Sequence, residues 1–317
     1  MNGQTMNALS WKNGISRFGM SRLCNWKTAL LLLTSSLSLA AIAQPSPVSL
    51  PSQRPGLQAY WFPAPTSTTQ PTLIMLHGCS GTLSKQGRLT PDRLSDATLF
   101  NQAGIHLLVL DSFSGRGIKS ICELARDFRP INERDRRQDV IDALVWLKQQ
   151  PGVGTQFAVL GRSHGGQTVL TLLSDALAKQ DPNGVEVLAN LQGAIALYPG
   201  CRQELADPHY RISHPLLMLT GALDDWTAPA PCAALHQKLR ERQPEMRFDY
   251  TSYADSYHGF DGTAPLRVRS QVANTRSGQA TVGGNPLARQ AAYDAIFSFL
   301  EQIWQRPLSP KPSFSAQ

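Results

Sequence analysis

The sequence predicts an α/β protein with a mostly parallel central sheet and helices on both faces. From residue 72 onward, short apolar segments of strand length alternate with longer segments of helical periodicity. The apolar segments show no polar alternation, which is typical of parallel strands buried on both faces. In addition, a Gly-x-Ser-x-Gly motif at Gly161–Ser163–Gly165 joins one such strand directly to a helix.

Six apolar segments are predicted to form the parallel strands, and the earlier segment 57–62 an edge strand. Helices between successive parallel strands give right-handed connections. The predicted strands are residues 72–76, 105–110, 157–160, 191–197, 216–220 and 248–253, and the predicted helices are 92–102, 133–149, 167–179, 232–242 and 286–305. No internal repeat or composition break marks a second domain, so one catalytic domain is expected over 72–306. Residues 307–317 are expected to form a tail.

The N-terminal region has the features of a secretory signal. Residues 1–43 contain four basic residues and no acidic one, and an apolar stretch over 29–42 ends in the small residues Ala41 and Ala43. This stretch is short and rich in serine for a membrane span. We therefore expect a periplasmic or secreted protein, cleaved near Ala43, with an extended segment over 44–71. An uncleaved anchor is the alternative, and translation could begin at Met1 or Met20.

The net charge of +7 comes largely from that region. Without its four basic residues, 26 basic side chains face 23 acidic ones, a balance of only about +3. No basic run interleaved with aromatic residues is present, which argues against a nucleic-acid partner. After signal cleavage no stable membrane partner is expected either.

Four cysteines remain after removal of Cys24, and none is spaced as in a zinc or redox motif. In an oxidising compartment they are expected to form two disulfides. Three pairings are compatible with the sequence. We favour Cys79–Cys122 and Cys201–Cys232, because each pair joins segments that follow neighbouring predicted strands.

The Gly-x-Ser-x-Gly motif predicts a nucleophile at Ser163. A strand that turns at once into a helix needs a sharp bend, and the flanking glycines remove Cβ atoms that would clash there. The bend exposes the serine hydroxyl at a helix N-terminus, where free N–H groups favour negative charge. This environment suits acyl transfer.

A base and an acid follow later strands of the predicted sheet. The carboxyl ends of parallel strands meet at one edge, where ligands bind. His258 follows the last strand and is the candidate base, whereas a surface-loop histidine is the simpler interpretation of any single His. Asp224 or Asp225 could orient its ring, and Asp224 is preferred because it lies at the strand end.

An oxyanion hole is predicted from two backbone N–H groups. One belongs to His164, the residue after the nucleophile, and the other to Cys79, after the bend at Gly78. The side chains of His77 and His164 are interpreted as packing or rim groups. No metal or organic cofactor is predicted.

The order of these motifs resembles the dienelactone hydrolase family within the α/β-hydrolase fold, from about residue 73 to residue 300. The resemblance implies that Ser163, Asp224 and His258 act as nucleophile, acid and base on a small ester substrate. The enzymes that give the family its name use a cysteine nucleophile, whereas a serine suits general carboxylic esters. The matching segments are 77–79, 111–113, 136–147, 161–166, 198–201, 221–229 and 257–260.

Two rival functions remain open from the sequence. A peptidase or acyltransferase could use the same scaffold, and a lactone could replace the ester. A non-catalytic binding protein would not require three intact catalytic residues. Residues 261–285, with Arg267, Arg269 and Arg276, are expected to form either a solvated mobile loop or a flap that meets an acidic substrate group.

Overall fold

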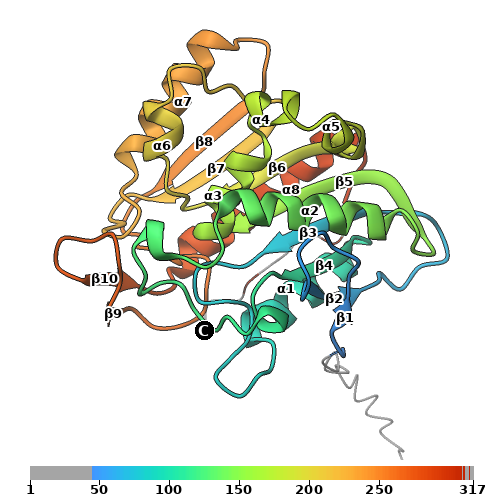
Figure 1. The fold of residues 1–317 in the computed structure, drawn as a ribbon, viewed down its shortest axis with the longest axis horizontal. Helices are drawn as coiled ribbons and strands as arrows, with labels where there is room; N and C mark the ends of the chain where they lie inside the picture. The colour runs from blue at the N-terminus through green and yellow to red at the C-terminus, as the bar shows by residue number, and fades with distance from the viewer. Residues whose placement is uncertain (1–44, 309, 311–313, 315–317) are drawn as a thin grey trace, which may run out of the picture. The chain divides into compact units, whose positions relative to one another are not determined.

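An eight-stranded sheet forms the centre of the protein (Figure 1). The structure is a computed structural model that describes residues 45–308, 310 and 314, so the predicted signal peptide lies outside the described residues. All six predicted parallel strands are present, and Leu57–Phe62 is found as a strand one residue shorter. The strands are β1 Val48–Ser49, β2 Gln58–Phe62, β3 Gln70–Leu76, β4 His106–Asp111, β5 Val153–Arg162, β6 Leu191–Leu197, β7 Leu216–Gly221 and β8 Phe248–Tyr253.

The strand order is β1-β2-β4-β3-β5-β6-β7-β8. From β4 to β8 all neighbouring strands are parallel, whereas β2 runs antiparallel to β4 and to β1. The predicted edge strand is therefore the second strand, and the two-residue β1 forms the edge. Strands β3 and β4 are buried along their whole length, which explains the runs of apolar residues within them.

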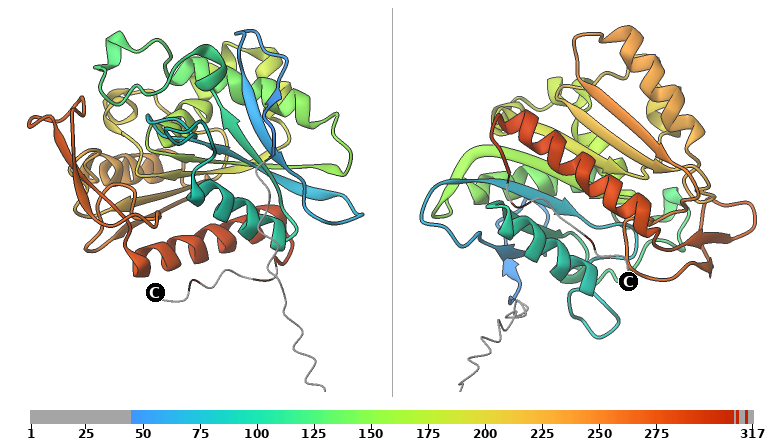
Figure 2. Two further views of the ribbon diagram at one scale, coloured as in Figure 1. Left: turned by 90° about the horizontal axis from the view of Figure 1, so that it is seen from below. Right: turned by 180° about the vertical axis from the view of Figure 1, so that it is seen from behind.

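Helices cover both faces of this sheet, as predicted. The helices α1, Pro91–Gln102, and α8, Pro286–Trp304, pack on one face, where the rings of Phe100 and Phe297 stack at 5.4 Å. The opposite face carries α2, Glu133–Leu147, α3, His164–Leu172, and α7, Ala230–Arg242. Figure 2 shows α1 and α8 together on one side of the sheet and α2 on the other.

Helices α2 and α8 begin where their sequences provide an N-cap. The side chain of Asn132 accepts hydrogen bonds from the N–H groups of Arg134 and Asp135, and the N–H of Asn132 donates to the carboxylate of Asp135. The side chain of Asn285 likewise accepts hydrogen bonds from N–H groups at the start of α8. The proline that follows it lacks an N–H, which costs nothing at the first helical position. These caps satisfy donors that would otherwise lack partners inside the helix.

The single helix predicted over 167–179 was wrong. Helix α3 ends at Leu172, and a separate short helix, α4, spans Asp175–Lys179. Between them, the carbonyl of Leu173 accepts a hydrogen bond from the N–H of Ser213, and Ser174 forms a β-bridge with Ile212. A neighbouring segment thus takes the backbone groups that a continuous helix would use. Two more short helices were not predicted, α5 Pro182–Leu188 and α6 Arg202–Ala206.

The segment 261–285 contains an antiparallel hairpin rather than only loop. Its strands are β9, Arg267–Ser270, and β10, Gln279–Val282. Each has four largely polar residues, too few to give an apolar pattern. The hairpin is attached to three other segments: Thr281 donates to Asp225, Ala273 N–H to the carbonyl of Cys122, and Gly283 N–H to the carbonyl of His258.

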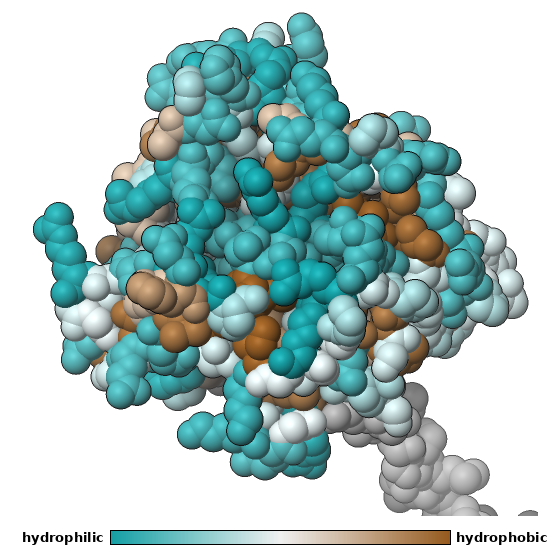
Figure 3. Space-filling model, in the orientation of Figure 1, coloured by the Kyte–Doolittle hydropathy of each residue, from teal (hydrophilic) through white to brown (hydrophobic). Residues whose placement is uncertain are grey.

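The surface in the view of Figure 3 is mostly hydrophilic, with apolar residues in separate patches. Within the described part of the chain, no helix combines the length and apolar character needed to cross a membrane. The C-terminal tail is partly packed, because Leu308 is buried and Phe314 contacts the ring of Tyr293 at 5.0 Å.

Candidate active site

Ser163 occupies a sharp bend between β5 and α3. Its backbone has φ 55° and ψ −117°, a conformation that is strained for a residue with a side chain. Space for the bend depends on glycine: a Cβ on Gly161 would lie 2.1 Å from the carbonyl oxygen of Gly165, and one on Gly165 would lie 2.6 Å from that of Leu76. The N–H of Ser163 donates to Leu197 in β6 at 2.9 Å. The bend is therefore packed against the end of β3 on one side and hydrogen-bonded to β6 on the other.

The structure brings Ser163, His258 and Asp224 together. The Oγ of Ser163 lies 2.9 Å from Nε2 of His258, and Nδ1 of the same ring lies 2.8 Å from Oδ2 of Asp224. Ser163 follows β5, Asp224 follows β7 and His258 follows β8, all at the carboxyl edge of the sheet. His258 and Asp224 are both buried, with 5 % and 4 % of their surface exposed. This is the arrangement in which an imidazole can take a proton from a serine hydroxyl.

Asp224 is held as an ionised acceptor. Its Oδ1 accepts hydrogen bonds from the N–H groups of Trp226 and Thr227 at 2.9 and 2.8 Å. Burial raises the pKa of Asp224, but His258 and these hydrogen bonds outweigh burial, so the pKa is lowered overall. Asp225 points elsewhere, because both of its carboxylate oxygens accept hydrogen bonds from Thr281 of the hairpin. Of the two acids left open by the sequence, Asp224 is thus the one beside His258.

Both residues predicted to supply oxyanion donors lie next to Ser163. His164 is the first residue of α3, where a backbone N–H has no acceptor inside its own helix. On the opposite side, a Cβ on Gly78 would lie 3.3 Å from Cβ of Ser163, so the turn carrying Cys79 passes close to Ser163. The structure thus places two backbone segments beside the serine hydroxyl.

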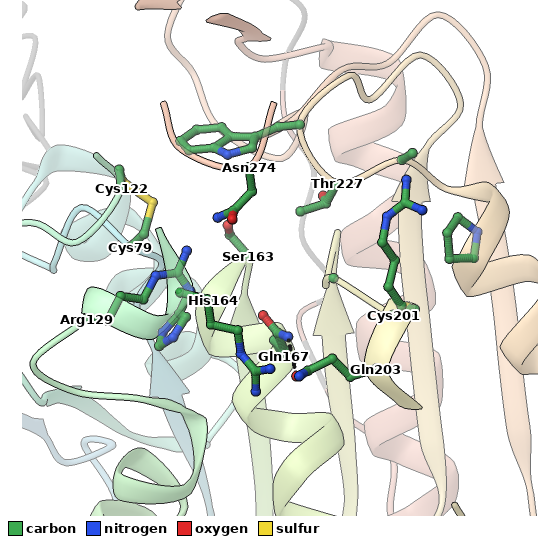
Figure 4. A pocket seen from close by; sticks show the side chains of 16 residues that line it. Cys79, Cys122, Arg129, Ser163, His164, Gln167, Cys201, Gln203, Thr227 and Asn274 are labelled. Atoms are coloured by element: carbon green, nitrogen blue, oxygen red, sulfur yellow. Dashed lines mark hydrogen bonds between the residues drawn. A yellow bond between two sulfur atoms is a disulfide. The ribbon is translucent and has the colours of Figure 1, made fainter. Parts of the chain in front are cut away.

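Two cavities meet at Ser163. One, of about 240 Å³, is lined by Arg126, Arg129 and Arg202, and the other, of about 260 Å³, extends toward His258 and the hairpin. Cys79, Ser163 and Trp226 line both. Figure 4 shows the first cavity, with the Cys79–Cys122 disulfide on one side, Cys201 on the other, and Asn274 reaching toward Ser163.

The predicted cysteine pairs are bonded in the structure. Cys79 joins Cys122, with 4.9 Å between their Cα atoms, and Cys201 joins Cys232, with 5.1 Å. Both disulfides border the first cavity, through Cys79, Cys122 and Cys201. Among the described residues, no group of three or more His, Cys, Asp or Glu side chains is arranged to hold a metal ion.

The sequence profile of the dienelactone hydrolase family matches residues 62–304, well over half of the chain. The chain belongs to the dienelactone hydrolase family. This membership identifies the protein as a carboxylic ester hydrolase. No sequence among curated proteins matches it.

Solved structures of other proteins share the fold of this family member. A candidate dienelactone hydrolase from Klebsiella pneumoniae subsp. pneumoniae MGH 78578 aligns with a TM-score of 0.57 at 15% identity, over 81% of this chain and 98% of its own. Esterase 2 of Thermogutta terrifontis, with propionate bound, aligns with a TM-score of 0.58 at 16% identity, over 85% and 97%. The predicted α/β-hydrolase fold is confirmed.

Several residues that contact His258 and Asp224 in this dienelactone hydrolase family member were not predicted. The Oγ of Thr227 lies 3.0 Å from the carbonyl oxygen of Tyr198, 2.9 Å from Oδ2 of Asp224 and 3.1 Å from Nδ1 of His258. The rings of Tyr198 and Trp226 lie 4.6 and 4.8 Å from the His258 ring. These contacts restrict the rotation of the imidazole. In the sequence, only the position of these residues within the matching segments pointed to them.

Arg136 was also missed, although it is fully buried beside the site. Its Nη1 donates to Nδ1 of His164 and its Nη2 to the carbonyl of His77, each at 2.8 Å. Burial lowers the pKa of Arg136 to about 10, against the raising effect of nearby carboxylates. The other ring nitrogen of His164 lies 3.2 Å from Oε1 of Glu133. Burial lowers the pKa of His164 to about 4, so its ring is neutral at neutral pH.

A second buried arginine, Arg162, directly precedes Ser163. Its Nε donates to Asp261 at 2.5 Å, and its Nη2 lies 3.3 Å from Asp96 and 3.1 Å from the hydroxyl of Tyr293. Asp261 also accepts from the hydroxyl of Tyr198 at 2.6 Å. Burial lowers the pKa of Arg162, but Asp261 and Asp96 raise it well above its ordinary value. This network connects β5 to the loop that carries His258.

Proposed function

We propose that this protein hydrolyses carboxylic esters through an acyl-enzyme formed on Ser163. The observation that carries the proposal is the continuous path from Ser163 Oγ through both nitrogens of His258 to Asp224, with steps of 2.9 and 2.8 Å. A serine hydroxyl is a weak nucleophile unless a base lies within hydrogen-bond reach, and here one does.

In the first half of the reaction, Oγ of Ser163 bonds to the ester carbonyl carbon as its proton passes to Nε2 of His258. The carbonyl oxygen becomes an oxyanion, and its collapse breaks the bond to the alcohol oxygen. That oxygen takes the proton from Nε2 and leaves as the alcohol. Asp224 holds Nδ1–H and stabilises the imidazolium that exists between these transfers.

In the second half, water attacks the acyl carbon and gives its proton to Nε2 of His258. Collapse of the second tetrahedral intermediate breaks the bond to Ser163, which recovers its proton, and the acid is released. The N–H groups of His164 and Cys79 donate to the oxyanion in both halves. Removal of one such donor typically lowers turnover by about 10²–10³-fold.

The two cavities at Ser163 suit a substrate with a group on each side of the ester. Each has a volume of only about 240–260 Å³. Arginine and glutamine side chains, including Arg129, Gln167 and Gln203, line the first. We therefore expect small or polar esters to be better substrates than long-chain lipid esters, because an alkyl chain would desolvate these side chains without pairing them.

We also propose that the protein acts after export, in the periplasm or outside the cell. Two disulfides support this location, because such bonds persist in oxidising compartments. The N-terminal sequence of protein recovered from the medium or periplasm tests it. A chain that begins near residue 44 is expected, and a protein retained in the cytoplasm with its N-terminus intact would contradict export.

Covalent labelling tests the nucleophile. Thermogutta terrifontis esterase 2, which shares the fold, has been solved phosphorylated by paraoxon. We expect a fluorophosphonate to add one equivalent to this protein, and the label and esterase activity to disappear in Ser163→Ala. Mass spectrometry of the labelled peptide identifies the site. Labelling at another serine, or esterase activity that survives in Ser163→Ala, would refute the mechanism.

Asp224 and Asp225 provide a matched pair to test the acid. Asp224→Asn removes the charge beside His258 and favours the wrong tautomer, which is expected to lower kcat by about 10⁴-fold. Asp225→Asn changes the neighbouring carboxylate, which bonds the hairpin, and should leave kcat within about tenfold of the unmodified protein. Steady-state kinetics on a p-nitrophenyl ester measures both. Equal losses in the two variants would remove Asp224 from the mechanism.

A further inference from the structure

His77 makes two hydrogen bonds with the backbone directly beside the proposed oxyanion hole. It directly follows β3, at the start of the turn, and 2 % of its surface is exposed. Its Nε2 lies 3.3 Å from the N–H of Ser112, which can only donate. Nε2 is therefore the unprotonated nitrogen, and Nδ1 carries the hydrogen. Nδ1 lies 2.8 Å from the carbonyl oxygen of Gly78 and donates to it.

The carbonyl of Gly78 belongs to the same peptide unit as the N–H of Cys79. Because a peptide unit is planar, a hydrogen bond that fixes its carbonyl also fixes the direction of its N–H. A donor on the carbonyl also draws electron density from the amide, which makes the N–H a stronger donor. The N–H of Gly81 makes a longer contact with the same carbonyl, at 3.3 Å. Of these two donors, the closer is the imidazole.

We propose that His77 is a positioning residue that orients and polarises the Gly78–Cys79 peptide as a donor to the oxyanion. The proposal rests on the proposed function, because it concerns the second oxyanion donor of that mechanism, the N–H of Cys79. The triad itself does not hold this donor in place. His77 exchanges no proton with the substrate. It acts through the peptide bond that follows it.

The surroundings of His77 keep its ring neutral and in one tautomer. Burial and the charge of Arg136 lower its pKa well below 6.5, and His164 and Arg93 add to this effect. The carboxylate of Asp111 stays 4.0 Å from Nε2, and the ring of Phe113 packs edge-on at 4.4 Å. A neutral ring with one N–H can make both observed contacts, whereas an imidazolium would direct a second N–H at the N–H of Ser112.

Arg136 joins this turn to the other proposed donor segment. It donates to the carbonyl of His77 and to the ring of His164, so one guanidinium holds the residues on either side of Ser163. His77 therefore acts within a turn whose position is already fixed, and its contribution is the orientation of the next peptide. Arg136 binds the backbone carbonyl of His77, so this hydrogen bond remains possible when the His77 side chain is substituted.

The protein contains a matched control in His106. This histidine is equally buried, at 2 % exposed, and also bridges two backbone groups: Nδ1 accepts from Ala64 N–H at 2.8 Å, and Nε2 lies 2.9 Å from the carbonyl of Gly152. It begins β4, at the end of the sheet opposite the site. A substitution there removes the same number of backbone hydrogen bonds without touching the oxyanion hole.

The test compares His77→Leu, His77→Asn and His106→Leu in the full mature chain. We expect His77→Leu to lower kcat by about 10- to 100-fold, less than complete loss of a donor, with KM within about threefold. The inhibition constant of an alkyl trifluoromethyl ketone, which forms an oxyanion on the serine, should rise by the same factor. His77→Asn places an amide N–H near the position of Nδ1 and should recover most of kcat. His106→Leu should lower Tm but keep kcat within about threefold.

The proposal is overturned if His77→Leu keeps full kcat, or if His106→Leu loses as much. If His77→Leu does not fold, the pair His77→Asn and His77→Gln decides. The longer glutamine cannot place its N–H at Nδ1, so Asn should exceed Gln in kcat by about tenfold, and equal values would refute the role. Failure of the triad itself is recognised separately, by fluorophosphonate labelling that survives in Ser163→Ala.

Discussion

Two buried arginines lie on either side of Ser163, and their charges are balanced in different ways. Arg162, the residue before Ser163, contacts two carboxylates, Asp261 and Asp96. Arg136, which contacts the residue after Ser163, donates only to neutral acceptors, a carbonyl and an imidazole nitrogen. Accordingly, the pKa of Arg162 is raised well above its ordinary value, whereas burial lowers that of Arg136 to about 10.

This difference indicates two separate roles for buried positive charge in one site. The charge of Arg162 is balanced by Asp261, on the loop that carries His258, and by Asp96 in α1, so it links β5 to that loop. The charge of Arg136 is compensated only at longer range, by Asp139, Glu133 and Asp111. It therefore leaves a positive potential beside the segments that would bind an oxyanion, which is where negative charge develops.

The largest effect is expected from Arg162→Met. It leaves Asp261 buried without the cation that contacts it and Asp96 with Arg93 alone, and loss of one partner of a buried ion pair costs about 3–5 kcal/mol. Urea unfolding measures the change. Lys179→Met, which breaks the exposed pair with Asp175, is the control and should cost less than about 1 kcal/mol. A loss for Arg162→Met as small as that of the control would show that its carboxylates do not depend on it.

At equal concentrations of folded protein, Arg136→Met should lower turnover more than Arg162→Met does. It leaves two buried acceptors unpaired, at about 1–3 kcal/mol each, and removes the positive potential from the oxyanion hole. We expect kcat to fall by about 10- to 100-fold with little change in KM. Arg136→Lys keeps the charge but cannot hold both acceptors, so its kcat should be intermediate. Unchanged kcat in Arg136→Met would assign the residue a purely structural role.

The smallest effect concerns His164, the acceptor of Arg136. Its folded pKa of about 4 lies below 6.5, so between these values the unfolded chain binds more protons and stability falls as the pH falls. The expected loss from this group is about 1 kcal/mol between pH 6.5 and 5.5. It should be absent in His164→Asn but retained in His209→Asn, which changes an exposed histidine. An unchanged pH dependence in His164→Asn would contradict a neutral buried ring.

The features predicted from the sequence are those that depend on neighbouring residues or on the order of the strands along the chain. The apolar strands, the glycines around Ser163 and the order of Ser163, Asp224 and His258 all follow from local pattern and from the rule that parallel strands end at one edge. The partners of Arg136 and Arg162 could not be predicted, because they join residues 28 to 131 positions apart. In the sequence these arginines resemble ordinary surface cations.

The same limit explains the errors in secondary structure. Helix 167–179 has an uninterrupted helical pattern, and its break at Leu173 depends on Ser213, which is brought there by the fold. The hairpin over 261–285 has strands too short to recognise, and contacts with Asp225 and Cys122 hold it in place. Asp224 and Asp225 could be ranked but not separated, because only their distant partners differ.

The edge strand β8 affects whether two molecules of this protein can associate through their sheets. Among the described residues, strand β8 pairs only with β7, and the opposite edge strand β1 has two residues. An unpaired strand is a template for intermolecular β-pairing, which charged side chains discourage. Arg247 and Asp249 form an ion pair at the start of β8, and Thr251 and Ser252 are exposed along it. The charged and polar side chains along β8 therefore disfavour pairing of this edge with a second molecule.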